Sequence, residues 1–161
     1  MIRKLFFLLL TAAALLPLSA GLCEPSEVEL LVDLPADAVL ETDLLFEDGS
    51  FSRLYTLPGG GTLSLLRWMH FTMDANELLE SEWTDISGRK DLSLTKVGAY
   101  PASGLEADVR EEKKGYHLTL VLVTVEDSTL IFETLIPEGS KAHPELLESL
   151  SVQGGGSAPL G

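Results

Sequence analysis

The stretch that decides the fold is Tyr116-His117-Leu118-Thr119-Leu120-Val121-Leu122-Val123-Thr124-Val125, which is followed by a polar turn and then by Thr129 to Ile136. Its side chains alternate between two faces, and near the centre both faces are apolar. A strand that is apolar on both sides needs cover on both sides, so this segment is predicted to lie in the middle of a sheet. The turn at Glu126-Asp127-Ser128 predicts a hairpin, whose second strand ends at Pro137.

Other strands are expected on the same ground of alternation. They are residues 28–34, 62–71 and 92–97, and a strand whose inward positions are Leu105, Ala107 and Val109. In that last strand Glu106 and Asp108 take the alternate positions, so we expect their carboxylates on a solvated face. The strand at 62–71 follows Pro58-Gly59-Gly60-Gly61, which is a turn rather than a phosphate-binding loop because no helix begins after it.

A second hairpin is predicted between Leu44 and Tyr55. Asp48-Gly49 suits a two-residue turn, because both central positions of such a turn need positive φ. That register would place Phe46 opposite Phe51 as an aromatic cross-strand pair.

Two helices are predicted beside the strands. Asp74 and Glu77 fit a capping box at the start of the first helix, and Gly88 occupies the position of its C-terminal cap. The second helix begins at Pro144 and would bury Leu146, Leu147 and Leu150. The predicted fold class is therefore α+β, an antiparallel β-sheet meander with two helices packed against it.

The second half of the chain has a suggestive order of elements. Gly98-Ala99-Tyr100-Pro101-Ala102 leads into two long strands that end at residues 130–137, and a helix follows that finishes with Leu147-Glu148-Ser149-Leu150-Ser151-Val152. This order resembles the PsbP-like fold, shared by an extrinsic photosystem II subunit and by small exported bacterial proteins, many of them lipoproteins. The resemblance covers residues 28–152 in element order and rests mainly on residues 97–152. It implies an antiparallel sheet flanked by helices and an accessory or binding role, and it transfers no catalytic residue.

The first residues have the pattern of a secretory signal peptide. Arg3 and Lys4 precede a stretch of 14 uncharged residues, Leu5 to Leu18, and the small residues Ser19-Ala20-Gly21 follow. The apolar stretch is shorter than the about 20 residues that cross a bilayer. We expect a signal peptide over residues 1–21, a polar lead-in over 22–27, a single α+β domain over 28–152 and a flexible Gly-rich tail over 153–161. The protein is thus predicted to be extracytoplasmic, either secreted or periplasmic, with no membrane span in the mature chain.

Cys23 is the sole cysteine, so it has no partner for an internal disulfide but could pair between chains. Its position just after the export signal raises the question of lipid attachment. Bulky Leu22 stands directly before it, where lipoproteins usually have a small residue, so we favour a free thiol over a lipid anchor at Cys23.

The chain is strongly acidic, with 25 Asp and Glu residues against 11 Lys and Arg and a net charge of −14. Loss of Arg3 and Lys4 with the signal peptide would take that charge to −16. Such a chain is repelled by phosphate backbones, which argues against nucleic acid as a partner. The acidic surface is interpreted as solubilising rather than as a cation-binding site.

No residue pattern points to a particular reaction. The histidines His70, His117 and His143 are dispersed and lack a second His or Cys at metal-ligand spacing, and no serine lies in a G-x-S-x-G turn. His143 is interpreted as a helix N-cap or an exposed side chain. No catalytic, cofactor-binding or metal residue is therefore assigned, and no cofactor is predicted.

Two functions stay open at this point. The favoured one is a small non-enzymatic binding or accessory protein of the cell envelope or extracellular space, with an unknown protein or small ligand as partner and an unknown oligomeric state. The alternative is an extracytoplasmic hydrolase whose site assembles from distant residues such as His70, His117 and nearby acids. Convergence of these side chains in a deep pocket would favour the hydrolase.

Overall fold

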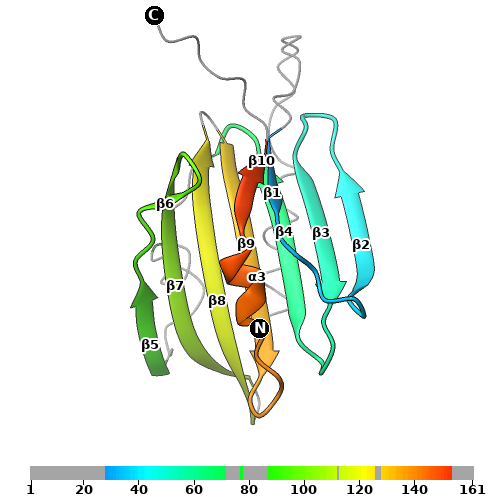
Figure 1. Cartoon of the computed structure of the whole chain (residues 1–161), viewed down its shortest axis with the longest axis vertical. Helices are drawn as coiled ribbons and strands as arrows, with labels where there is room; N and C mark the ends of the chain where they lie inside the picture. The colour runs from blue at the N-terminus through cyan, green and yellow to red at the C-terminus, as the bar shows by residue number, and fades with distance from the viewer. Residues whose placement is uncertain (1–27, 72–76, 78–86, 112, 126–127, 154–161) are drawn as a thin grey trace, which may run out of the picture.

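A computed structural model describes residues 28–71, 77, 87–111, 113–125 and 128–153 of the chain. Most of these residues belong to an eight-stranded antiparallel sheet (Figure 1). Seven of its strands follow the order β2-β3-β4-β9-β8-β7-β5, and β6 pairs with β7 outside this path. The strands are β2 (Val39–Leu45), β3 (Phe51–Thr56), β4 (Thr62–Trp68), β5 (Ser87–Leu92), β6 (Lys96–Val97), β7 (Tyr100–Glu111), β8 (Lys114–Val125) and β9 (Ser128–Pro137).

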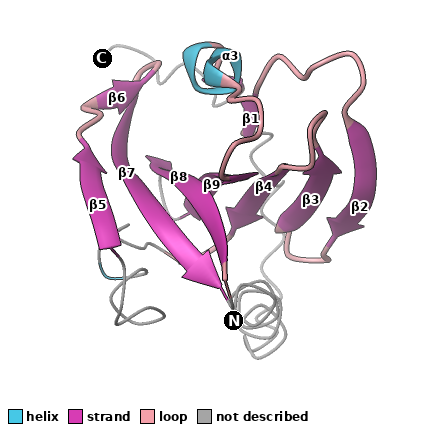
Figure 2. Cartoon of the chain, turned by 90° about the horizontal axis from the view of Figure 1, so that it is seen from below, coloured by secondary structure: helices cyan, strands magenta, loops and turns pink. Residues whose placement is uncertain are grey.

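A smaller layer covers one face of this sheet. It consists of β1 (Glu29–Leu31), α3 (Pro144–Glu148) and β10 (Ser151–Gln153), and β1 pairs with β10 in antiparallel register. The large sheet curves around this layer, with β5 at one end of the curve and β2 at the other (Figure 2). We call the face of the sheet turned toward α3 the inner face and the opposite one the outer face.

Two apolar clusters result from the alternation of side chains along the central strands. The outer face carries one cluster, to which β8 contributes Leu118, Leu120 and Leu122. The inner face carries the other, in which Val121 and Val123 of the same strand pack with Leu146 of α3. The prediction that β8 and β9 form a hairpin with apolar side chains on both faces is therefore confirmed.

The predicted fold class is wrong, because the described chain is mostly β-structure rather than a sheet with two packed helices. The helix predicted from Pro144 exists as α3, but it has five residues. The other predicted helix falls largely outside the described residues, and its expected C-terminal cap, Gly88, lies inside strand β5. Gly88 falls in an irregular part of the β5–β7 pairing, between Ser87 and Lys90, and glycine is common at such irregularities as well as at helix ends.

The β2–β3 hairpin is present, but its predicted register is off by one residue. Leu45 rather than Phe46 pairs with Phe51, and the Phe46 N–H donates to the Ser50 carbonyl oxygen at 2.9 Å. This closes a three-residue loop in which Gly49 has φ 86° and the Asp48 carboxylate accepts from the Ser50 N–H. A three-residue loop of this kind needs one residue in the left-handed conformation, and Gly49 supplies it. Asp48 therefore does not need positive φ.

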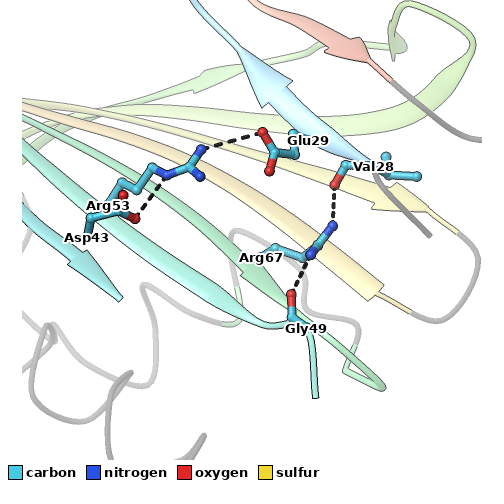
Figure 3. A network of polar contacts seen from close by, with 6 residues as sticks. All are labelled: Val28, Glu29, Asp43, Gly49, Arg53 and Arg67. Carbon is cyan, nitrogen blue, oxygen red and sulfur yellow. Dashed lines mark hydrogen bonds and ion pairs between the residues drawn. The ribbon is translucent and has the colours of Figure 1, made fainter. Parts of the chain in front are cut away.

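Two arginines connect β1 to the large sheet (Figure 3). Arg67, buried on the inner face of β4, donates hydrogen bonds to the carbonyl oxygens of Val28 and Gly49, each at 2.8 Å. Arg53 of β3 contacts Glu29 at 3.4 Å and Asp43 at 3.1 Å. Both guanidinium groups also lie over the ring of Phe51, at 4.9 Å for Arg53 and 5.2 Å for Arg67.

Within the described residues, no helix is both long and apolar enough to cross a membrane.

Candidate functional site

A groove of about 470 Å³ lies on the inner face between α3 and the strands β7, β8 and β9. We call it the α3 groove. Its apolar lining comes mainly from Phe132, Ile136 and Leu147, and its polar lining includes three glutamates and two histidines. Its lining residues are Glu106, His117, Thr119, Phe132, Thr134, Ile136, Pro137, Glu138, Gly139, Ser140, Ala142, His143, Pro144, Leu147 and Glu148.

Strand register arranges residues of the groove and its rim in two rows across the sheet. One row runs from Asp108 on β7 to His117 on β8 and on to Ile136 on β9. The neighbouring row runs from Glu106 through Thr119 to Thr134. Directly opposed residues in antiparallel strands have Cβ atoms about 5 Å apart, so side chains within each row are in reach of one another.

His117 lies between the two carboxylates of these rows. Its Nδ1 is 3.0 Å from Asp108 Oδ1, and its Nε2 is 4.0 Å from Glu106 Oε1. An ionised carboxylate only accepts hydrogen bonds, so Nδ1 carries the proton in the contact with Asp108. The other ring nitrogen, Nε2, faces the Glu106 carboxylate across the longer contact. The His117 and Asp108 side chains are 48% and 68% exposed, so this pair lies at the rim of the groove.

His143 is buried at the other wall of the groove, where the chain enters α3. Its Nε2 is 3.0 Å from the Pro58 carbonyl oxygen and its Nδ1 is 2.9 Å from Glu145 Oε1. The Pro58 carbonyl oxygen only accepts hydrogen bonds, so Nε2 is the donor in that contact. The hydrogen bond from His143 is the main cause that lowers the pKa of Glu145. His143 occupies the predicted N-cap position of α3, but its side chain makes no capping hydrogen bond.

The structure separates two of the histidines that the hydrolase hypothesis brought together. His70 is exposed and follows β4, whose last residue Trp68 pairs with Thr129, whereas His117 pairs with Ile136. These two positions on β9 are seven residues apart, which corresponds to roughly 23 Å along a strand. His70 therefore does not contribute to the α3 groove, and Cys23 lies outside the described residues.

The sequence did not reveal that Glu106 and Asp108 flank a histidine. Their alternation with Leu105 and Ala107 correctly indicated a face other than the outer apolar cluster. It did not indicate which side chains of β8 share that face. The position of the turn between β7 and β8 could have predicted this contact. Once Glu111 pairs with Lys114 beside that turn, the antiparallel register also pairs Asp108 with His117.

The described part of the chain holds no group of three or more His, Cys, Asp or Glu residues arranged to bind a metal ion. The hydrogen-bond and ion-pair partners of His117 among the described residues are carboxylates, and no hydroxyl or thiol nucleophile bonds to it there. The arrangement of the groove suits the binding of a hydrogen-bond donor more directly than it suits nucleophilic catalysis.

Glu133 is a titratable group on the outer face, away from the groove. It is half-buried on β9, between Ile131 and Leu135 of the outer apolar cluster, and is paired in register with Leu120. Burial raises the pKa of Glu133 to about 7. Its protonation therefore changes near neutral pH without any contact with the α3 groove.

No family model matches this chain, and no curated protein matches it in sequence. A solved structure has a similar fold. It is the crystal structure of LpqN from Mycobacterium tuberculosis, a protein involved in cell envelope biogenesis. The match has a TM-score of 0.51 and 13% sequence identity, and it covers 83% of this chain and 88% of LpqN. At this identity the similarity concerns the fold.

Proposed function

We propose that this chain is an exported accessory protein of the cell envelope that binds a ligand in the α3 groove. The ligand class that fits best has an apolar body and an amine or guanidinium group. The observation that carries this proposal is His117 held between Glu106 and Asp108 at the rim of an otherwise largely apolar groove.

The polar lining supports a ligand that donates hydrogen bonds. Glu106, Glu138 and Glu148 carry carboxylates, which accept hydrogen bonds when ionised. The described residues that line the groove include no lysine or arginine. An ammonium or guanidinium group would form charge-assisted hydrogen bonds with these carboxylates, which an anionic head group could not form.

The floor supports an apolar body. Phe132 and Ile136 are buried, and Leu147 of α3 is half-buried above them. Small-ligand sites usually combine such an apolar lining with a few polar groups that orient the ligand. The groove volume of about 470 Å³ lies within the ordinary range of these sites.

The assignment to the envelope rests on two independent supports. The basic, apolar and small-residue pattern of residues 1–21 is typical of export, and the fold is similar to that of LpqN, itself involved in cell envelope biogenesis. The resemblance to PsbP-like proteins stays a prediction. It agrees with an accessory role, but function argued from fold is weaker than function argued from a site.

A hydrolase is the second candidate, because His117 and Asp108 have the contact that orients a general base. The exposure of this pair and the carboxylate near Nε2 disfavour it, since catalytic bases work in water-excluded sites beside a nucleophile. Release of product from a panel of ester and amide substrates, lost in His117→Ala, would replace the binding proposal by this one.

Calorimetric titration with octylamine and octanoate tests the binding proposal, because these probes share one apolar chain and differ in the sign of the head group. We expect saturable binding of octylamine and weaker or absent binding of octanoate. Glu148→Lys should weaken octylamine binding, whereas Glu47→Lys makes the same charge change at an exposed position outside the groove. Equal binding of the two probes, or equal effects of the two variants, would contradict the proposal.

Cell fractionation and the mass of the mature protein test the export proposal. We expect an extracytoplasmic product shortened by about 21 residues, with no added lipid mass at Cys23. An unprocessed cytoplasmic product would contradict export, while an acylated product would show that Cys23 is a lipid anchor.

A further inference from the structure

The outward edge of β2 exposes an unusual amount of apolar surface. Val39, Leu40, Leu44 and Leu45 are 55%, 48%, 37% and 77% exposed. Within the described residues β2 has a strand neighbour on one side only, which is β3 (Figure 1). Such an edge offers unpaired backbone N–H and C=O groups as well as apolar side chains, and it is a template for an added strand.

The sequence of β2 is symmetric in chemical character. Val39-Leu40-Glu41-Thr42-Asp43-Leu44-Leu45 has two apolar residues at each end and two acids around a central threonine. A partner strand with the complementary pattern therefore fits in either direction. Its ends would be apolar and its centre would be basic.

The two acids argue against a second copy of this chain as the partner. In a symmetric antiparallel pairing about Thr42, Glu41 of each copy would oppose Asp43 of the other, and like charges directly opposed in a sheet destabilise it. The overall charge of −14 adds repulsion between copies.

The same acids attract a basic strand. Glu41 is exposed, and the Asp43 side chain is 50% exposed while it contacts Arg53 on the neighbouring strand (Figure 3). Arg53 holds the Asp43 carboxylate on the inner side of the sheet without covering it. The two acids of β2 thus repel a second copy of this strand and attract a basic strand. Specific interfaces commonly combine such repulsion of one partner with attraction of another.

We infer that β2 is a docking edge for an extended segment of another protein, in which lysine or arginine residues lie between apolar residues. The segment would add a strand to the large sheet next to β2. This site is separate from the α3 groove, so its failure would leave the proposed function untouched.

The test uses the mature chain and two labelled peptides, Leu-Leu-Lys-Thr-Lys-Leu-Val and the same sequence with glutamate in place of both lysines. Fluorescence anisotropy should show saturable binding of the lysine peptide and about tenfold weaker binding of the glutamate peptide, from two cross-strand charge pairs. Glu41→Lys should reverse or cancel this preference. Leu45→Asp should weaken both, whereas Phe71→Asp introduces the same charge at another exposed apolar residue and should not.

Three results would overturn the inference. One is equal affinity for the two peptides, and another is absence of binding of the lysine peptide at millimolar concentration. The third is a concentration-dependent dimer in sedimentation experiments that Leu45→Asp abolishes, because the occupant of the edge would then be a second copy.

Discussion

The guanidinium group of Arg67 donates a hydrogen bond from Nη1 to the carbonyl oxygen of Val28, 2.8 Å away, so an interior residue of β4 holds the entrance to β1. The same guanidinium donates to the Gly49 carbonyl oxygen in the β2–β3 loop. Desolvation lowers the pKa of Arg67, and the charge of Glu29 opposes that effect. A buried cation is tolerated here because backbone acceptors and the Phe51 ring surround it.

Arg67→Ala should lower the free energy of unfolding by about 3 kcal/mol, because it leaves two buried carbonyl groups without their charged donor. Arg53→Ala removes a partly exposed guanidinium and should cost about 1 kcal/mol or less. Urea denaturation of both variants checks the difference. Similar losses in the free energy of unfolding for the two variants would show that the greater burial of Arg67 does not increase its contribution to stability.

Glu133 should make stability fall with rising pH. Its folded pKa of about 7 exceeds the ordinary value of 4.5, so the folded state binds the extra proton between these two values. The stabilising effect is therefore complete below about pH 4.5 and is lost as pH rises through about 7, with a total of roughly 3 kcal/mol.

Glu133→Gln should remove this slope and be more stable than the parent chain at pH 8, while the two should be similar at pH 4.5. Urea denaturation at both pH values measures the effect, and Glu138→Gln serves as an exposed control. An equal difference between the parent chain and Glu133→Gln at both pH values would refute the shifted pKa.

Ser50 and Ser52 offer a matched pair of substitutions in β3 and its preceding loop. Both side chains are buried, but Ser50 Oγ accepts from the Met69 N–H at 3.1 Å, whereas Ser52 Oγ has no hydrogen-bond partner among the residues that the structure describes. Ser52→Ala should raise the free energy of unfolding by about 1 kcal/mol, and Ser50→Ala should lower it by a similar amount. Thermal denaturation of the two variants gives the sign directly, and a loss for both would mean that Ser52 Oγ has a partner in solution.

His143→Ala should lower the free energy of unfolding by about 2 kcal/mol, because the Pro58 carbonyl oxygen loses its donor. It should also raise the pKa of Glu145 toward its ordinary value, since the His143 hydrogen bond is the main cause of the depression. The contribution of Glu145 is present above its unfolded pKa and is lost as pH falls through its lower folded pKa. NMR titration of the Glu145 carboxyl in the parent chain and in His143→Ala checks this. An unchanged pKa of Glu145 in the variant would show that the His143 hydrogen bond is not the cause of the depression.

The central hairpin was predictable because its information is local. Alternation in β8 separated Leu118 and Leu120 from Val121 and Val123, and the two sets lie in different clusters as expected. The pairing of β1 with β10 was not predictable in this way. Ser151–Gln153 is too short to show a period, and its partner strand is more than a hundred residues earlier in the chain.

The candidate site was partly predictable. His117 was singled out as a residue of a possible assembled site, but its partners Glu106 and Asp108 were assigned to solvent. The prediction that His143 is a helix N-cap is confirmed for its position, while its ring is buried between Pro58 and Glu145 rather than exposed. Sequence alternation gives the face of a strand, while the contacts on that face depend on register and on the loop that crosses it.

The β1–β10 pairing has a consequence for the order in which the protein is completed. Leu30 aligns with Val152, and the Asp33 N–H donates to Ser149 Oγ, so the first described strand has its partners among the last residues. A ribosome or a translocation channel delivers the first strand well before the last. Closure of the layer over the inner face must therefore wait until the final strand has emerged, and the cost of joining such distant segments makes this a late event. Until β1 and β10 pair, the chain therefore stays open enough to pass through a narrow channel.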